Sequence, residues 1–233
     1  MTGALEPISR RGRVLLIVAA GIEADAVLNG LGARGPAPAE WTPEKIGDRF
    51  ELVVSGVGKA AAAGAAARFL DPAAHAAVVS LGVAGALPGG GLSIGDTVCA
   101  TRAVFADEGF ETPDGFTDIS SAGFPPGPEG GMGVACRAEL IEALTPITDA
   151  AGPVATVSTC AGTDALAAAV AARTGAIAEA MEGGAVGVSA WRVGCAVWFS
   201  ELRVISNTTG DRDRQEWDLK GSLRVLGGLA GRL

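Results

Sequence analysis

The sequence has few of the residues that build most metal and nucleophile sites. It contains one histidine, His75, and its four cysteines lie far apart without a Cys-x-x-Cys pair: Cys99, Cys136, Cys160 and Cys195. A zinc site of Cys/His type and a histidine-based catalytic triad are therefore not expected. We expect no metal and no cofactor, and we expect free, partly buried thiols in a reducing cytoplasm.

Basic residues and long hydrophobic runs are also scarce. The chain has 18 Lys+Arg against 26 Asp+Glu, a net charge of -8, and no basic stripe, which argues against nucleic acid as the main partner. No apolar run approaches the roughly 18 residues of a membrane span, so no membrane partner is expected either.

The N-terminal stretch "RRGRVLLIVAAGIEADA" has the basic start and apolar run of a signal peptide. However, Glu6 interrupts the leader, and the apolar run is short and rich in strand formers. Two acids, Glu23 and Asp25, follow it at once. We therefore interpret this stretch as the first core strand.

The remaining composition indicates one globular domain, since the 233 residues are 48% hydrophobic and 19% charged. We assign residues 1–13 to an N-terminal tail and 14–233 to the domain. Strands are predicted at the apolar runs "RVLLIVAA", "FELVVSGV", "AAVVSLGVAG", "DTVCATRAVF", "VATVSTC" and "AVWFSELRVISN". Helices are predicted at "GKAAAAGAAARFL", "GTDALAAAVAARTG", "EGGAVGVSAWRVG" and from about Gln215 onward. This alternation is typical of an α/β sandwich with a largely parallel sheet.

A long stretch rich in glycine and proline, residues 107–133, interrupts the alternation. It does not have the pattern of core sheet, so we predict an excursion loop. Long loops in compact domains are usually functional or mobile.

The turn "SGVGKAAAAG" is similar to a nucleotide-binding loop. It is not a Walker A motif, because Val53 and Ala60 occupy two of its defining positions. It satisfies the loose form G-x-G-x-x-A, but no acid follows about 20 residues later. A tight turn that needs glycine explains it equally well, and its N–H groups could face an anion.

Four acidic or amide residues are stronger candidates. Glu182 begins a helix of small apolar residues with no nearby lysine or arginine in the sequence; it is either a helix-capping acid or a carboxylate that binds a ribose diol. Asn207 ends a strand, where it could cap the following turn or bind a ligand. Glu23 and Asp25 are solvated acids of a helix start, or one of them is a general base toward water.

The order of the segments "GIEADAV", "SGVGKAAAA", "SLGVAGALPGGGLSIGDTV", "VSTCAGTDA", "AMEGGAV" and "RVISN" resembles the nucleoside phosphorylase/nucleosidase superfamily. Within it, "FADEGFETPDGF" and "ISNTTGDRDRQEWDL" are most similar to the futalosine hydrolase family of bacterial menaquinone synthesis. The resemblance runs from about Val14 to Leu219. It implies a single three-layer α/β/α domain around a mixed, mostly parallel, partly closed sheet. It also implies a homo-oligomer, commonly with dimers in which a neighbour's loop covers the sugar's 5′ side.

The resemblance also implies roles for individual residues. Glu182 would hold the 2′- and 3′-hydroxyls with Met181 under the ribose, Asn207 would face N7 of the purine, and Asp25 or Glu23 would activate water. By alignment Asp25 lies nearer the acid of the relatives than Glu23 does. Further substrate contacts are expected from Ala84, Gly85, Gly162, Thr163, Phe110 and Phe116, and Arg212 or Arg214 is expected to pair with the charge of the 5′ substituent.

An asparagine at the purine indicates a 6-oxopurine. Cleavage of the bond between C1′ and N9 leaves negative charge on the base, so a donor at N7 stabilises the transition state. An aspartic acid suits adenine, whereas beside N7 and O6 an amide can donate without needing a proton. Asn207 therefore favours hypoxanthine or guanine nucleosides over methylthioadenosine, which agrees with futalosine.

Water is the expected nucleophile, because a phosphate dianion needs cations and hydroxyls. The Gly56–Gly58 turn has no arginine, and Lys59 is expected to point into solvent. Two alternatives stay open: a phosphate-dependent purine nucleoside phosphorylase, and a nucleoside- or dinucleotide-binding module without turnover.

Overall fold

The hydrophobic runs form the longer strands of one nine-stranded sheet, in a computed structural model that describes residues 3–194 and 196–233. Cys195 lies outside the described residues. The longer strands are β1 (Arg13–Val18), β3 (Phe50–Val54), β4 (His75–Ala86), β5 (Thr97–Phe105), β9 (Ala150–Thr156) and β11 (Trp198–Thr208). The shorter ones are β2 (Glu44–Ile46), β8 (Gly133–Ala135) and β10 (Ala178–Ala180).

The sheet is mixed, and its interior is mostly parallel. Parallel pairs join β1 to β3 and β4, β11 to β4, and β9 to β5 and β10. Antiparallel pairs join β2 to β3, β5 to β8 and β11, and β10 to β4. Because β10 bonds to both β9 and β4, the strands β4, β11, β5, β9 and β10 close into a ring. The predicted mixed, partly closed sheet is confirmed.

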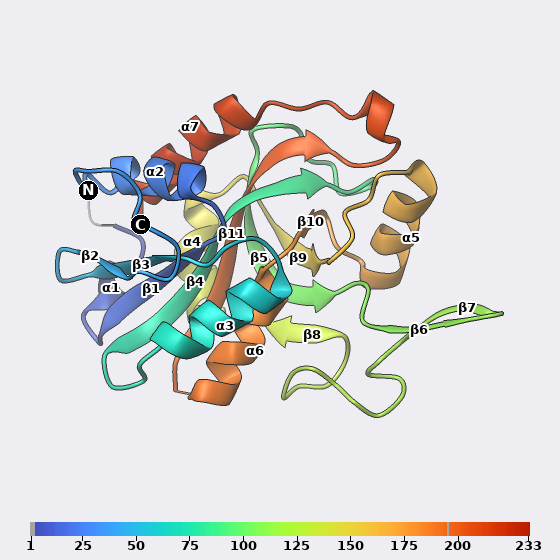
Figure 1. The fold of residues 1–233 in the computed structure, drawn as a ribbon, viewed down its shortest axis with the longest axis horizontal. Helices are drawn as coiled ribbons and strands as arrows, with labels where there is room; N and C mark the ends of the chain where they lie inside the picture. Colours follow the sequence, from blue (N-terminus) through green and yellow to red (C-terminus); the bar gives the residue numbers. More distant parts are fainter. Residues whose placement is uncertain (1–2, 195) are drawn as a thin grey trace.

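Helices cover the sheet on two faces (Figure 1), as the three-layer prediction requires. One face carries α3 (Lys59–Phe69) and α6 (Gly183–Val193), which pack on each other. The other carries α2 (Gly21–Gly30) and α7 (Leu219–Ala230), together with α1 (Glu6–Ser9) and α4 (Ala138–Leu144). Within β1, Leu15 and Ile17 belong to the first hydrophobic cluster and Val14, Leu16 and Val18 to the second. Both faces of the strand are buried, as its unbroken hydrophobic run predicts.

The N-terminal segment packs on the domain at the chain's other end. Leu5 is fully buried, and its N–H donates to the Leu233 carbonyl at 2.8 Å. The first described residues and the C-terminal residues therefore lie side by side (Figure 1). The segment assigned to a tail therefore contributes to the core.

The excursion at residues 107–133 contains a two-stranded ribbon of its own, β6 (Gly109–Thr112) and β7 (Gly115–Asp118). It extends away from the body of the molecule (Figure 1). Phe110 on β6 is 49% exposed, whereas the ring of Phe116 lies 4.3 Å from the guanidinium of Arg173. Two short 3-10 helices, η1 (Thr145–Ile147) and η2 (Arg212–Arg214), and α5 (Asp164–Thr174) complete the fold. No helix in the described ranges combines the length and hydropathy needed to cross a bilayer.

Candidate active site

Several strands end at one edge of the sheet, around a cavity of about 460 Å³ that we call the sheet-edge cavity. Its polar side chains come from segments far apart in the sequence and include Glu23, Glu179, Glu182, Ser206, Asn207, Arg212 and Gln215. The carboxyl ends of strands are the usual location of binding sites in α/β folds.

Glu23, at the start of α2, is fixed inside this cavity by backbone. Its Oε1 accepts from the Val83 N–H at 2.8 Å and its Oε2 from the Ala20 N–H at 3.0 Å. The side chain is 5% exposed, and burial raises the pKa of its carboxyl although both N–H groups lower it. Asp25 lies outside the cavity: it is exposed, and its Oδ1 accepts from the Ala37 N–H at 2.7 Å. Of the two acids that the sequence leaves open, only Glu23 lines the site.

Glu182, which immediately precedes α6, is 5% exposed and bridges two parts of the site. Its Oε1 accepts from the Gly58 N–H at 3.0 Å, and its Oε2 lies 3.3 Å from Arg203 Nη1. The glycine turn that is similar to a nucleotide loop therefore presents its N–H to a carboxylate of the same chain.

Arg203 is a residue that the sequence interpretation missed. It lies in β11, is 1% exposed, and donates from Nε to Glu201 Oε1 and from Nη2 to Ser80 Oγ, both at 2.8 Å. Together with its ion pair to Glu182, these contacts fix it beneath the cavity. The signal was available, since Glu201 and Arg203 are two charges inside an otherwise hydrophobic strand, and such charges must find partners when buried.

Asn207 lies in β11 beside Gly85 of β4, its partner in the strand register, and is 7% exposed. Its Oδ1 accepts from the Ser206 hydroxyl at 2.9 Å, and its Nδ2 donates to the Thr208 carbonyl at 2.8 Å. One of the two amide hydrogens is therefore used within the chain, and one remains for a ligand.

The structure brings most of the other predicted contact residues to the same cavity. Ala84, Gly85, Gly162 and Met181 line it. Thr163 does not: it is the N-cap of α5, and its Oγ1 accepts from the Leu166 N–H at 3.1 Å. Phe110 and Phe116 also lie outside it, on the β6–β7 ribbon.

The mouth of the cavity carries Arg212 and a set of exposed apolar side chains. The Arg212 guanidinium lies 5.0 Å from the centre of the Trp217 ring, and its Nη1 donates to Gln215 Oε1 at 3.1 Å. Arg214 instead pairs with Asp164 and Asp211 on the surface. The exposed apolar side chains at the mouth are Ile22, Val57, Trp217 and Leu219.

Lys59 differs from its predicted solvent orientation. It is mostly buried and pairs with Asp107 and Glu108, which follow β5. Asp107 in turn accepts from the N–H groups of Ser158 and Thr159. The single lysine near the glycine turn is thus held by two carboxylates of the chain.

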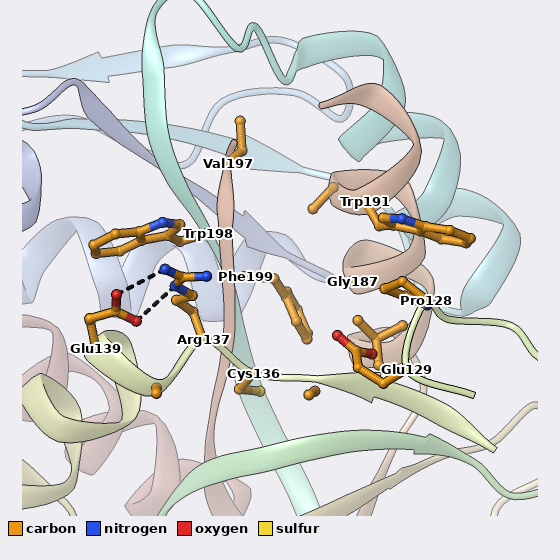
Figure 2. A pocket seen from close by; sticks show the side chains of 14 residues that line it. Pro128, Glu129, Cys136, Arg137, Glu139, Gly187, Trp191, Val197, Trp198 and Phe199 are labelled. Carbon is orange, nitrogen blue, oxygen red and sulfur yellow. Dashed lines mark hydrogen bonds and ion pairs between the residues drawn. The ribbon is translucent and has the colours of Figure 1, made fainter. Parts of the chain in front are cut away.

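A second cavity of about 540 Å³ lies between α6, β8 and the start of β11 (Figure 2). Its Arg137 and Glu139 pair with each other at 2.7 Å. Burial raises the pKa of the Cys136 thiol well above its usual value, so this thiol is not an activated nucleophile. The sheet-edge cavity, with its several buried carboxyl groups, is the better candidate for chemistry.

Sequence comparison identifies the family. The model of the phosphorylase superfamily matches residues 43–227. The chain belongs to the phosphorylase superfamily. It is 40% identical over 224 residues to a futalosine hydrolase of Acidothermus cellulolyticus, covering 91% of this chain and 86% of the relative. It is 36% identical over 239 residues to a futalosine hydrolase of Streptomyces coelicolor, covering 94% of each.

Solved nucleosidase structures share the fold. A mutant MTAN of Helicobacter pylori with 5′-methylthioadenosine in its active site matches with a TM-score of 0.72 and 19% identity, over 94% of this chain and 95% of that one. A 5′-methylthioadenosine/S-adenosylhomocysteine nucleosidase of Neisseria meningitidis in complex with methylthio-immucillin-A matches with a TM-score of 0.72 and 22% identity, over 95% and 99%. The resemblance stated from the sequence motifs is confirmed.

Proposed function

We propose that the protein hydrolyses the N-glycosidic bond of a 6-oxopurine nucleoside, with futalosine as substrate and hypoxanthine and dehypoxanthine futalosine as products. This is a step of menaquinone biosynthesis by the family resemblance. The observation that carries the proposal is the convergence of Glu23, Glu182 and Asn207 on one cavity. The similarity to two futalosine hydrolases supports the choice of substrate.

In the proposed reaction, Glu182 accepts hydrogen bonds from the 2′- and 3′-hydroxyls, and Met181 packs under the ribose. Arg203 holds Glu182 in place from below. Glu23 accepts a proton from water, which attacks C1′ as the C1′–N9 bond breaks. The bonding electrons move into the base, where the free N–H of Asn207 donates to N7. The base takes a proton from solvent as it leaves, and Glu23 returns to solvent the proton that it accepted, so one water is consumed for each bond cleaved.

The cations near the ribose side favour water over phosphate. Arg203 is already bound to Glu182, Glu201 and Ser80, and Lys59 to Asp107 and Glu108. A phosphate dianion would have to break these pairs before it could bind. Water needs only an acceptor, which Glu23 supplies.

Arg212 is proposed to bind the 5′ substituent of futalosine, an aromatic ring that carries a carboxylate. Its guanidinium can pair with that carboxylate while the exposed apolar side chains at the mouth contact the ring. Phe110 and Phe116 lie outside the cavity of their own chain, and we propose that they cover the site of a second copy in a homo-oligomer. A cytoplasmic location stays a prediction from the cysteine pattern.

The deciding experiment is incubation with futalosine, inosine and methylthioadenosine in phosphate-free buffer, with detection of the free base. We expect hypoxanthine from futalosine, little adenine, and a rate that does not change when phosphate is added. A rate that depends on phosphate would select a phosphorylase. A nucleoside-dependent melting shift without base release would select a binding module.

The amide of Asn207 is tested by Asn207→Asp. At neutral pH a carboxylate beside N7 and O6 repels both acceptors, so kcat/KM for futalosine should fall by about 100-fold or more. Steady-state kinetics on the purified variant measure this. An unchanged rate would contradict the account of base specificity.

A further inference from the structure

Glu179 is a second acid on the base side of the sheet-edge cavity, and no role has yet been given to it. It lies in β10, is 5% exposed and lines the cavity. Its register partner in β4 is Gly85, which is also the partner of Asn207 in β11. Residues paired across adjacent strands project to the same face. Glu179 and Asn207 therefore flank Gly85 on that face.

The two side chains converge over Gly85. A Cβ placed on this glycine would lie 2.9 Å from Thr209 Cγ2, 3.0 Å from Asn207 Nδ2 and 3.6 Å from Glu179 Cγ. A side chain at this position would clash, so glycine allows the Asn207 amide and the Glu179 side chain to lie close to the strand. Both residues line the cavity with Gly85, so a flat heterocycle bound beside this glycine would meet both.

Only one oxygen of the Glu179 carboxyl group has a hydrogen-bond partner among the described residues. Its Oε1 accepts from the Ala161 N–H at 2.8 Å. Its Oε2 is buried and, among the described residues, has no hydrogen-bond partner. A buried carboxyl oxygen without a donor is costly, which indicates that a ligand supplies the hydrogen.

The base of the proposed substrate has such a hydrogen. A 6-oxopurine carries N1–H beside the O6 acceptor, whereas a 6-aminopurine carries a bare N1 acceptor beside an amino group. Asn207 has one free amide hydrogen, which in the proposed complex donates to N7, so Asn207 does not contact N1. We propose that Glu179 Oε2 accepts the N1–H of the 6-oxopurine and thereby selects it over a 6-aminopurine. This inference rests on the proposed function and identifies the residue that binds N1 of the base.

Glu179 also occupies the backbone N–H donor that would suit adenine. The Ala161 N–H borders the same cavity and could donate to a bare N1. It donates to Glu179 Oε1 instead, so the cavity presents an acceptor where it would otherwise present a donor. The Glu179 carboxyl group must be ionised for its Oε2 to accept this hydrogen bond. The pKa of Glu179 is raised, chiefly by burial and also by the charge of Asp107, although the Ala161 N–H lowers it. A bound N1–H would stabilise the ionised form and lower this pKa.

The test is the variant Glu179→Gln. The side-chain oxygen of the glutamine can still accept from the Ala161 N–H, and the NH₂ group then faces N1. We expect kcat/KM for inosine and futalosine to fall by about 10- to 100-fold. Cleavage of adenosine should rise, because the new NH₂ donates to its N1. The exposed Glu44→Gln on β2 is the matched control, and it should leave both rates unchanged.

Binding of free bases tests the same contact without turnover. Calorimetry with hypoxanthine, 1-methylhypoxanthine and adenine uses the methyl group to remove N1–H. The unmodified protein should bind hypoxanthine at least about 10-fold more tightly than 1-methylhypoxanthine, and Glu179→Gln should lose this preference. Equal binding of the two bases by the unmodified protein would overturn the proposal, even if the variant does not fold. Equal losses for inosine and adenosine in a folded variant would overturn it too.

These outcomes are distinguishable from failure of the proposed function. If the protein releases no base from any nucleoside, the hydrolase proposal fails while the hypoxanthine preference can still be measured. If it hydrolyses futalosine without discriminating against the methylated base, the hydrolase proposal stands and the role of Glu179 fails.

Discussion

Each carboxyl group of the cavity is distinguished by the partners that it already has. Glu23 accepts from two backbone N–H groups, Glu182 accepts from Gly58 and pairs with Arg203, and Glu179 has one oxygen without a partner among the described residues. Backbone N–H groups cannot move far, so the Glu23 carboxyl group stays fixed in the cavity. A positioned general base requires this kind of restraint.

Glu23 and Asp25 give a matched test of the general base. Glu23→Gln keeps the shape of the side chain and removes the basic oxygen, so kcat/KM should fall by about 10²- to 10⁴-fold. Asp25→Asn keeps an oxygen for the Ala37 N–H and should change kcat/KM by less than about twofold. Base release from futalosine measures both variants. A large loss in Asp25→Asn with a small one in Glu23→Gln would reverse the assignment.

The pH dependence follows from the burial of Glu23. Its raised pKa means that the carboxylate gains a proton at a higher pH than an exposed glutamate does. Since the base must be ionised, kcat/KM should fall as pH decreases through this raised pKa, by about tenfold per pH unit. The profile of Glu23→Gln should lack this acid limb. An inflection at the ordinary glutamate pKa would contradict the prediction.

Residue identity alone predicts part of this site. Motifs mark Glu182, Asn207, Met181 and Gly85, and all four line the cavity. The choice between Glu23 and Asp25 could not be made, because it depends on the angle at which α2 leaves β1. Arg203 was missed although its charge inside a hydrophobic strand is visible in the sequence. Glu179 was missed because its meaning depends on strand pairing.

At the scale of elements, the sequence predicts the long members of the fold and not the short ones. Hydrophobic runs correspond to β1, β3, β4, β5, β9 and β11, and alanine-rich segments to α3 and α5. The three-residue strand β10 is too short to show a period, yet it closes the ring and carries Glu179. Short strands of this kind are fixed by tertiary pairing, which local sequence does not report.

The packing of α2 on α7 gives a test with a matched control. A Cβ on Gly30 would clash with the backbone carbonyl oxygen of Gly227, whereas a Cβ on the exposed Gly228 meets nothing within 4 Å. Gly30→Ala should lower the free energy of unfolding by about 1–3 kcal/mol. Gly228→Ala should raise it by about 0.5–1 kcal/mol, because alanine favours a helix over glycine. Urea denaturation of both variants measures the difference, and equal effects would contradict this packing.

At the scale of the whole molecule, the unexplained feature is the ribbon that leaves the body of the chain (Figure 1). The sequence predicts an excursion over residues 107–133, and the superfamily resemblance implies that a neighbour's loop covers the sugar's 5′ side. The β6–β7 ribbon could act on the cavity of its own chain or on that of a second copy, and the two cases differ only in the assembled oligomer. A second copy must therefore be part of the test.

Mixing two variants makes that test. Phe110→Ala keeps an intact cavity, since the exposed ring contributes little to its own fold, and it should raise KM for futalosine more than for inosine. Glu23→Gln is inactive but keeps an intact ribbon. In a dimer whose ribbons cover the partner's cavity, a mixed pair has one complete site. After subunit exchange, about a quarter of all sites should regain the low KM for futalosine. If KM stays at the Phe110→Ala value after verified exchange, the ribbon does not act on the site of a second copy.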